Sequence, residues 1–253
     1  MNWKKKRAPE NRVKIAILAD IHGNLEAFLA VRADLEAQGA VRVICLGDNI
    51  GYGPDPEEVV RQLRQLGYES VLGNHEFALM KLQGRRWLNY QAAENNIETE
   101  KLLSNQSKAY CCTLPTFLVF ENAHFVHGYP PASVFLYLDR QSDEKIAALF
   151  NSASATLFFL GHTHRLGLVS GQEGVITRKV LGQETVVFLP DKKYIINCGS
   201  VGQPRDGDRR AKYLLWDPEA GQAEVRFVEY DNKKTIKKIR DRGFPEIYAA
   251  RLC

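Results

Sequence analysis

Short apolar runs alternate with longer amphipathic stretches over the first third of the chain. Apolar runs at residues 13–18, 41–46 and 70–72 predict buried strands, because strands covered on both faces are almost continuously hydrophobic. Leucine, valine and phenylalanine recur at helical spacing in the two stretches between these runs, which end at Gly39 and Gly67. The order strand, helix, strand, helix, strand indicates the beginning of an α/β domain.

The second of these helices has a start signal in the sequence. Asp55 is a good N-cap residue, Pro56 occupies the first helical position, and Glu58 follows three residues after Asp55. This spacing predicts a capping box, in which the Asp55 side chain accepts a hydrogen bond from a backbone N–H of the first turn.

The chain changes character at residue 77. Residues 77–114 are polar and helix-forming, which predicts a helical cap insert over the mouth of a site rather than a separate domain. Apolar runs at 116–121 and 123–126 then predict a hairpin, residues 142–150 a helix, and residues 156–160 another buried strand.

Short strand-like runs dominate after residue 164. They predict a second, largely antiparallel sheet and lie at residues 166–169, 174–180, 184–189, 194–197, 213–216 and 223–230. Residues 232–252 are predicted to be helical, with a break at Gly243 and Pro245. We find no internal repeat in the sequence. The 253 residues of the chain are predicted to form a single domain.

Composition and charge narrow the class of protein. A formal net charge of +4 is compatible with small anionic substrates and does not demand nucleic acid. The positive charge gathers in residues 4–7, within a predicted flexible basic tail over residues 1–12, and in residues 233–242. We expect a solvated tail and a solvated helix face; a contact with a polyanion is the alternative.

The lack of a recognisable targeting or membrane-spanning segment and the pattern of cysteines predict a cytoplasmic protein without a membrane partner. No apolar run reaches the ~18 residues that a membrane span needs, and no long apolar segment follows the basic residues 1–12, so we expect no signal peptide. The five cysteines are odd in number and lack metal-like spacing, as expected in a reducing compartment.

Five short polar motifs punctuate the chain, and nearly all of them follow a predicted strand. They are Asp20-x-His22, Gly47-Asp48-Asn49, Gly73-Asn74-His75-Glu76, His127-Gly128 and Gly161-His162-Thr163-His164. Functional sites in α/β sheets gather at the carboxyl ends of strands, so we expect these motifs to converge. Oxygen and imidazole donors in such numbers can hold two divalent ions side by side.

Each motif alone is a weak signal, and only their conjunction is informative. Asp20 and His22 lie two residues apart, so in extended geometry both side chains project the same way, and His162 and His164 repeat this spacing. Asp48 is the natural bridging ligand, because a carboxylate has two oxygens and enough charge for two cations. His124, which should face away from His127 in a strand, receives no metal role.

The ordered set of motifs over residues 20–164 resembles the calcineurin-like metallophosphoesterase superfamily. A further stretch, residues 197–208, resembles a loop of a bacterial and archaeal branch whose members are described as phosphodiesterases or as relatives of diadenosine tetraphosphatase. The likeness therefore spans almost the whole chain.

The resemblance implies a role for each position. A first ion would be bound by Asp20, His22, Asp48 and His164, and a second by Asp48, Asn74, His127 and His162. His75 would not bind metal and would act at the leaving-group oxygen or the scissile phosphate as general acid or charge stabiliser. Glu76 would orient its neighbours, or else lie exposed at the start of a helix.

One departure from the superfamily bears on the substrate. Protein Ser/Thr phosphatases carry G-D-x-x-D-R-G, whose arginine grips phosphate, but residues 47–53 here lack the Asp-Arg pair. This argues against protein-phosphatase activity. Arg205 is a replacement phosphate contact, or forms a salt bridge with Asp206 or Asp208. Tyr52 stacks on a substrate base or packs internally.

Pattern and resemblance together predict a four-layer α-β-β-α sandwich of two mixed sheets with flanking helices. The expected activity is hydrolysis of phosphodiester or nucleotide-like phosphoanhydride bonds by direct attack of a metal-bridging hydroxide. The expected cofactors are two divalent ions, drawn from Mn, Fe, Zn, Ni or Co. The partner would be a small phosphorylated substrate; nucleic acid is not favoured, because a nuclease needs an electropositive groove. Alternatives are a phosphomonoesterase or protein phosphatase using the same site, and a non-catalytic scaffold of the same fold.

Overall fold

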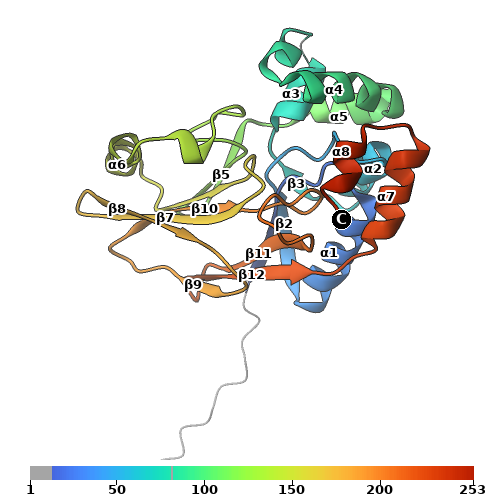
Figure 1. The fold of residues 1–253 in the computed structure, drawn as a ribbon. Coiled ribbons are helices and arrows are strands. Elements are labelled where there is room, and N and C mark those ends of the chain that lie inside the picture. Colours follow the sequence, from blue (N-terminus) through green and yellow to red (C-terminus); the bar gives the residue numbers. More distant parts are fainter. Residues whose placement is uncertain (1–12, 81) are drawn as a thin grey trace, which may run out of the picture.

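Two six-stranded sheets form the centre of the molecule (Figure 1) in the computed structural model, which describes residues 13–80 and 82–253. The first sheet has the order β3-β2-β1-β11-β12-β9, with β1 Lys14–Leu18, β2 Ala40–Cys45, β3 Glu69–Ser70, β9 Thr185–Val187, β11 Ala211–Asp217 and β12 Gln222–Val228. The second has the order β4-β5-β6-β10-β7-β8, with β4 Phe117–Phe120, β5 Ala123–Val126, β6 Leu157–Leu160, β7 Leu166–Gln172, β8 Val175–Val180 and β10 Lys193–Cys198.

Both sheets are mixed, as predicted. Strands β1, β2 and β3 run parallel in the first sheet, and β5, β6 and β10 run parallel in the second. The prediction that all strands after residue 164 form the second sheet is wrong. Strands β9, β11 and β12 extend the first sheet through the antiparallel pairing of β11 with β1, in which Ala16 lies opposite Leu215. An apolar run indicates a buried strand but does not identify its partner.

The main hydrophobic core lies between the two sheets. Ile15 and Ile17 of β1 face the same cluster as Phe125 of β5 and Phe159 of β6, and all four side chains are fully buried. The Trp216 ring of β11 lies 5.3 Å from that of Phe159, so the two inner faces interdigitate.

Helices cover the outer face of each sheet and complete the predicted four layers. Helices α1 (Leu25–Ala37) and α2 (Pro56–Gln65) pack on the first sheet through Phe28, Val31 and Val59. Helix α6 (Asp143–Ser152) packs on the second sheet through Ile146 and Phe150. Between β5 and α6 lies a 3₁₀ turn, η2 (Leu138–Arg140).

The segment predicted as a helical insert is helical. It contains α3 (Asn74–Met80), the 3₁₀ turn η1 (Leu82–Trp87), α4 (Tyr90–Leu102) and α5 (Asn105–Thr113). Figure 1 shows α3, α4 and α5 together on one side of the sheets. Two asparagines of α4 hold the loops beneath it: Asn95 accepts a hydrogen bond from the Tyr52 N–H at 2.6 Å, and Asn96 donates one to the His75 carbonyl at 2.9 Å.

The C-terminal segment forms two helices, α7 (Asn232–Asp241) and α8 (Glu246–Ala250), with the predicted break between them. The predicted capping box of α2 is wrong. Asp55 does precede the helix, but its side chain makes no cap hydrogen bond and instead accepts one from Lys238 of α7 at 2.7 Å. A lysine from the far end of the chain thus competes successfully with the local backbone donor.

Two further expectations concern the ends of the chain and the membrane. The basic tail, residues 1–12, lies outside the described residues. Among the helices of residues 13–80 and 82–253, none combines the length and the apolar character needed to cross a bilayer.

Candidate metal centre

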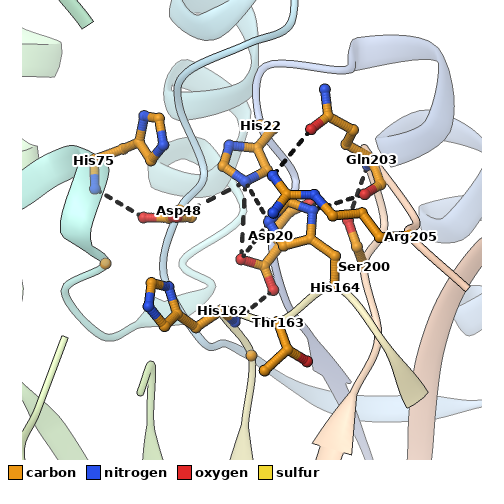
Figure 2. Close-up of polar contacts among 12 residues, drawn as sticks. Asp20, His22, Asp48, His75, His162, Thr163, His164, Ser200, Gln203 and Arg205 are labelled. Atoms are coloured by element: carbon orange, nitrogen blue, oxygen red, sulfur yellow. Dashed lines mark hydrogen bonds and ion pairs between the residues drawn. The ribbon is translucent and has the colours of Figure 1, made fainter. Parts of the chain in front are cut away.

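The loops after five strands bring the predicted ligands into one cluster (Figure 2). Asp20 follows β1 and Asp48 follows β2, while the loop after β3 leads into α3, which begins at Asn74. His127 follows β5, and the loop after β6 carries His162 and His164. Both sheets therefore contribute side chains, and all five strands do so from their carboxyl ends, as expected for this architecture.

The local backbone geometry differs from the extended geometry that was predicted. Asp20, His22 and Asp48 have φ angles of 53°, 50° and 51°, and His162 and His164 have φ angles of 69° and 58°. Non-glycine residues rarely adopt this left-handed conformation. The loops therefore turn sharply at the ligand positions, and these turns aim alternate side chains into the space between the strand ends.

Two groups of donor atoms in this cluster consist of predicted ligands, and a third joins His22 and Asp48 to His75. In the first, the Asp20 Oδ1 lies 3.8 Å from His22 Nε2 and 3.5 Å from His164 Nε2. In the second, the Asp48 Oδ2 lies 3.4 Å from His127 Nε2, which is 3.1 Å from His162 Nδ1.

Asp48 lies between the two groups. The same Oδ2 atom that approaches His127 is 3.7 Å from His22 Nε2 of the first group. Asn74 adds an amide oxygen to the second group, 2.9 Å from His127 Nε2. Asp48 is therefore placed as a bridging ligand should be.

His22 and His164 present unprotonated nitrogens to each other. The other ring nitrogen of His22, His127 and His164 lies 2.7–2.9 Å from a backbone carbonyl, which only accepts hydrogen bonds, so that nitrogen carries the proton. The inward nitrogens of His22 and His164 are then lone pairs that face each other at 3.0 Å. Such an arrangement repels unless a cation lies between the donors, and carbonyl-oriented imidazoles are typical of metal sites.

The electrostatics of the buried carboxyl and imidazole groups also favour a metal site. Burial raises the pKa of Asp20 to about 8, with the nearby Asp48 carboxylate adding to this shift against the opposing charge of His127. Burial alone would lower the pKa of His127, but Asp48 and Asp20 outweigh it and raise that pKa to about 9. Burial holds the pKa values of His22 and His164 well below their usual range. The donor set of two carboxyl groups and four imidazoles, together with the unpartnered buried Oδ1 of Asp20, fits a pair of divalent cations.

His75 lies beside the cluster with one nitrogen free. Its backbone N–H donates to Asp48 Oδ1 at 2.9 Å, and its ring lies 5.0 Å from that of His22. The buried Nδ1 has no hydrogen-bond partner. Gly51, with φ of +89°, allows this placement, because a Cβ there would lie only 2.3 Å from Nδ1.

Glu76 is fully buried, so the alternative of an exposed helix-start residue is wrong. Its carboxylate accepts hydrogen bonds from the backbone N–H groups of Asp48, Asn49 and Gly73 at 2.7–3.1 Å. Burial raises the pKa of Glu76 to about 7, with Asp48 adding to the shift. Glu76 therefore fixes the loop that carries Asp48.

Arg205 faces the cluster rather than its acidic neighbours. Asp206 accepts a hydrogen bond from Lys212 and Asp208 pairs with Arg210, and the described residues show no ion pair between Arg205 and either one. Its positive charge depresses the pKa values of His22 and His164 after the larger effect of burial, and Figure 2 shows its guanidinium beside both rings.

Tyr52 is packed internally. Its ring is 7% exposed and lies 4.6 Å from the His22 ring, 4.7 Å from His75 and 5.1 Å from Tyr248 of α8. The guanidinium of Arg205 lies 5.8 Å from the ring centre. Tyr52 thus packs against the rings of His22 and His75 and helps to hold them in position.

Three sets of residues outside the predicted ligands make contacts within the protein. His124 is hydrogen-bonded to the Pro131 carbonyl and stacks on Phe117. The Cys198 thiol is fully buried, and burial raises its pKa well above the usual range, in keeping with an inert thiol. The basic residues of α7 and its end form ion pairs with Glu26, Asp55, Asp241 and Glu246, so much of their charge is balanced within the protein.

Comparison with known families agrees with this site. Residues 13–221 match the family model described as the calcineurin-like phosphoesterase superfamily domain. The chain belongs to this superfamily. The matched range contains every residue of the two donor groups and His75, so the cluster is part of the superfamily domain itself.

Relatives within the superfamily are similar over nearly the full length. The uncharacterized protein MJ0912 of Methanocaldococcus jannaschii is 36% identical over 248 residues, which cover 94% of this chain and 96% of that protein. The crystal structure of a metallophosphoesterase from Sphaerobacter thermophilus has a TM-score of 0.80 and 32% identity, over 95% of this chain and 98% of that one. The hypothetical protein PH1004 of Pyrococcus horikoshii shares the fold, with a TM-score of 0.75 and 20% identity over 95% and 97%.

Proposed function

We propose that the protein is a phosphoesterase that works with two divalent cations. Asp20, His22, Asp48 and His164 would hold the first cation; Asp48, Asn74, His127 and His162 would hold the second. The observation that carries this proposal is the pair of inward nitrogens of His22 and His164, 3.0 Å apart with no proton to share. Mixed oxygen and nitrogen donors suit Mn, Fe, Zn, Ni or Co.

The cations, when bound, would activate a water molecule and neutralise charge on the phosphate oxygens. The protein residues supply the other functions. His75, whose buried Nδ1 has no partner, would give a proton to the leaving-group oxygen or stabilise its charge. Arg205 would bind the phosphate, because a guanidinium can donate two parallel hydrogen bonds to two phosphate oxygens.

The substrate class we propose is a phosphodiester or a nucleotide-like phosphoanhydride rather than a phosphoprotein. In the loop after Asp48 no arginine is available to grip a phosphate. Asn49 at the start of this loop is turned inward, where its side chain donates to Ser70 and Glu76. Five free thiols support the expectation of a reducing compartment.

The proposal is tested with purified protein loaded with Mn²⁺. We expect hydrolysis of bis(p-nitrophenyl) phosphate, and we expect Asp48→Ala to abolish it, because both donor groups lose their shared carboxylate. Asp241→Ala is the matched control, since that carboxylate is exposed and pairs with Lys237. Full activity of Asp48→Ala would exclude the bridging role. Inactivity of the wild-type protein with two bound ions would favour the scaffold alternative.

A further inference from the structure

A second arginine lies next to Arg205, and it comes from the C-terminal end of the chain. Arg251, the C-cap of α8, donates from Nη1 to the Gln203 Oε1 at 3.1 Å. Arg205 donates from Nη2 to the same oxygen at 3.3 Å. Two guanidinium groups therefore share one neutral acceptor at the edge of the metal centre.

Neither of these two positive charges is paired with a carboxylate among the described residues. Across residues 13–80 and 82–253, no carboxylate forms an ion pair with Arg205 or Arg251, whereas the nearby Arg210 and Arg240 pair with Asp208 and Glu246. The Nε of Arg205 is buried and lacks a hydrogen-bond partner. Like charges at this range repel, so the arrangement favours an anion from outside the chain.

The fold holds Arg251 in place rather than leaving it on a loose end. The Tyr248 hydroxyl donates to the Gln91 carbonyl of α4 at 2.9 Å, and the Leu252 carbonyl accepts from Asn232 of α7 at 2.7 Å. Leu252 is buried and lines the same small cavity as His22. Helix α8 packs beside α7 (Figure 1), and the ring of its Tyr248 lies 5.1 Å from that of Tyr52 in the loop after Asp48. Helices α7 and α8 thus present Arg251 to the site.

Arg205 lies nearer the metal centre than Arg251. Its guanidinium lies beside the rings of His22 and His164 (Figure 2) and 5.8 Å from the centre of the Tyr52 ring. Burial and the charge of Arg205 lower the pKa of Arg251, whereas Tyr52 and Tyr248 act in the opposite direction and raise it. Arg205 is therefore the inner guanidinium, and Arg251 is the outer one.

We propose that Arg251 binds a second phosphate of the substrate, adjacent to the phosphate that Arg205 holds at the metal centre. The substrate class is then a compound with two consecutive phosphates, such as a nucleoside diphosphate or a longer phosphoanhydride. This inference rests on the proposed function and narrows it, because a simple diester has no group for Arg251.

The test is equilibrium binding to the Mn²⁺-loaded full chain by calorimetry. The probes are methylenediphosphonate, which carries two linked phosphonates and is not hydrolysed at the bridge, and methylphosphonate, which carries one. We expect Arg251→Ala to reduce the preference for the two-phosphonate probe roughly 10- to 100-fold, the effect of losing a charge-assisted hydrogen-bonded contact. Arg251→Lys, which keeps the charge, should lose less.

Arg240→Ala is the matched control. It also removes one arginine from the segment formed by α7 and α8, but the charge of Arg240 is already paired with Glu246. It should leave the preference unchanged. An unaltered preference in Arg251→Ala, or an equal loss for both probes, would overturn the second phosphate site. Arg251→Gln, which keeps most of the side-chain volume, separates a folding defect from lost binding.

The two levels of proposal fail in different ways. If the wild-type protein hydrolyses bis(p-nitrophenyl) phosphate but Arg251 has no effect on the preference between probes, only the second phosphate site is wrong. If the wild-type protein binds Mn²⁺ yet neither binds these probes nor hydrolyses the diester, the proposed function itself is wrong.

Discussion

At the scale of single residues, the site depends on backbone conformations that side chains usually avoid. Six of the eight non-glycine residues with positive φ in the described chain belong to the loops of the site: Asp20, His22, Asp48, Tyr52, His162 and His164. Each such conformation costs roughly 1–3 kcal/mol, which the surrounding contacts must offset. The three backbone hydrogen bonds that Glu76 accepts are such contacts, because they fix the turn at Asp48.

His75 is predicted to serve in catalysis without holding metal. We expect His75→Ala to retain two bound ions and to lose turnover by roughly 10²- to 10⁴-fold, the range for removing a general acid. Metal analysis and the rate of diester hydrolysis on the same sample give both quantities. His124→Ala is the control, since His124 is partly buried outside the cluster. Loss of an ion from His75→Ala would instead make His75 a ligand, which its position within 4.8 Å of His22 and Asp48 donor atoms allows.

At the scale of elements, helix α7 ties the C-terminus to the loops of the site. Lys238 donates to Asp55 at 2.7 Å and forms an ion pair with Glu26 of α1 at 2.7 Å. Glu26 and Asp55 are only 8% and 7% exposed, so their charges are not well solvated by water. Lys238 therefore bridges two buried carboxylates at the starts of neighbouring helices, and Lys234 and Arg242 lie at 3.3 and 3.5 Å as their further partners. The Asp55 side chain is used in this bridge and makes no cap hydrogen bond in α2.

Replacing Lys238 by methionine should lower the free energy of unfolding by about 1–3 kcal/mol, because two buried carboxylates lose their nearest cationic partner while the side-chain volume is kept. The longer ion pairs with Lys234 and Arg242 remain. Urea unfolding at pH 7 measures this difference. Lys237→Met is the control, because the Lys237 side chain is 76% exposed and pairs with the exposed Asp241. A change of similar size in both variants would show that helix propensity, not the buried ion pair, is responsible.

The same pair of variants has a predictable pH dependence. Burial alone would raise the pKa of Glu26, but the hydrogen bonds and charge of Lys238, together with Lys234, lower it below its ordinary value of 4.5. The stability that Lys238 gives through Glu26 is therefore fully present above pH 4.5 and is lost as the pH falls through the lowered pKa. The difference between wild type and Lys238→Met should shrink in acid.

At the scale of the whole molecule, the sequence predicts the elements and the ligands but not how distant segments meet. Apolar periodicity located the strands and helices of the first third, and the motifs after them identified the cluster. Nothing in a local pattern indicates that β11 would pair with β1, that Lys238 would displace the cap at Asp55, or that Arg251 would reach Gln203. The contacts of Lys238 and Arg251 depend on the packing of α7 and α8, and the pairing of β11 with β1 joins strands that are far apart in the sequence.

The cations are predicted to join the two sheets, and this can be measured as stability. Asp20, His22 and Asp48 come from the first sheet, whereas His127, His162 and His164 come from the second. A ligand that binds only the folded state stabilises it by about 2.7 kcal/mol at 100 times its dissociation constant, so two such ions contribute about 5.4 kcal/mol, or roughly 10–20 °C in melting temperature for a chain of this size. We expect the chelator-treated protein to melt lower by this amount, and titration with Mn²⁺ to restore it at two equivalents. Asp48→Ala should lose most of the response and Asp241→Ala none of it. An unchanged melting temperature at saturating Mn²⁺ would mean that the folded protein does not bind the ions, because native-state binding necessarily raises stability.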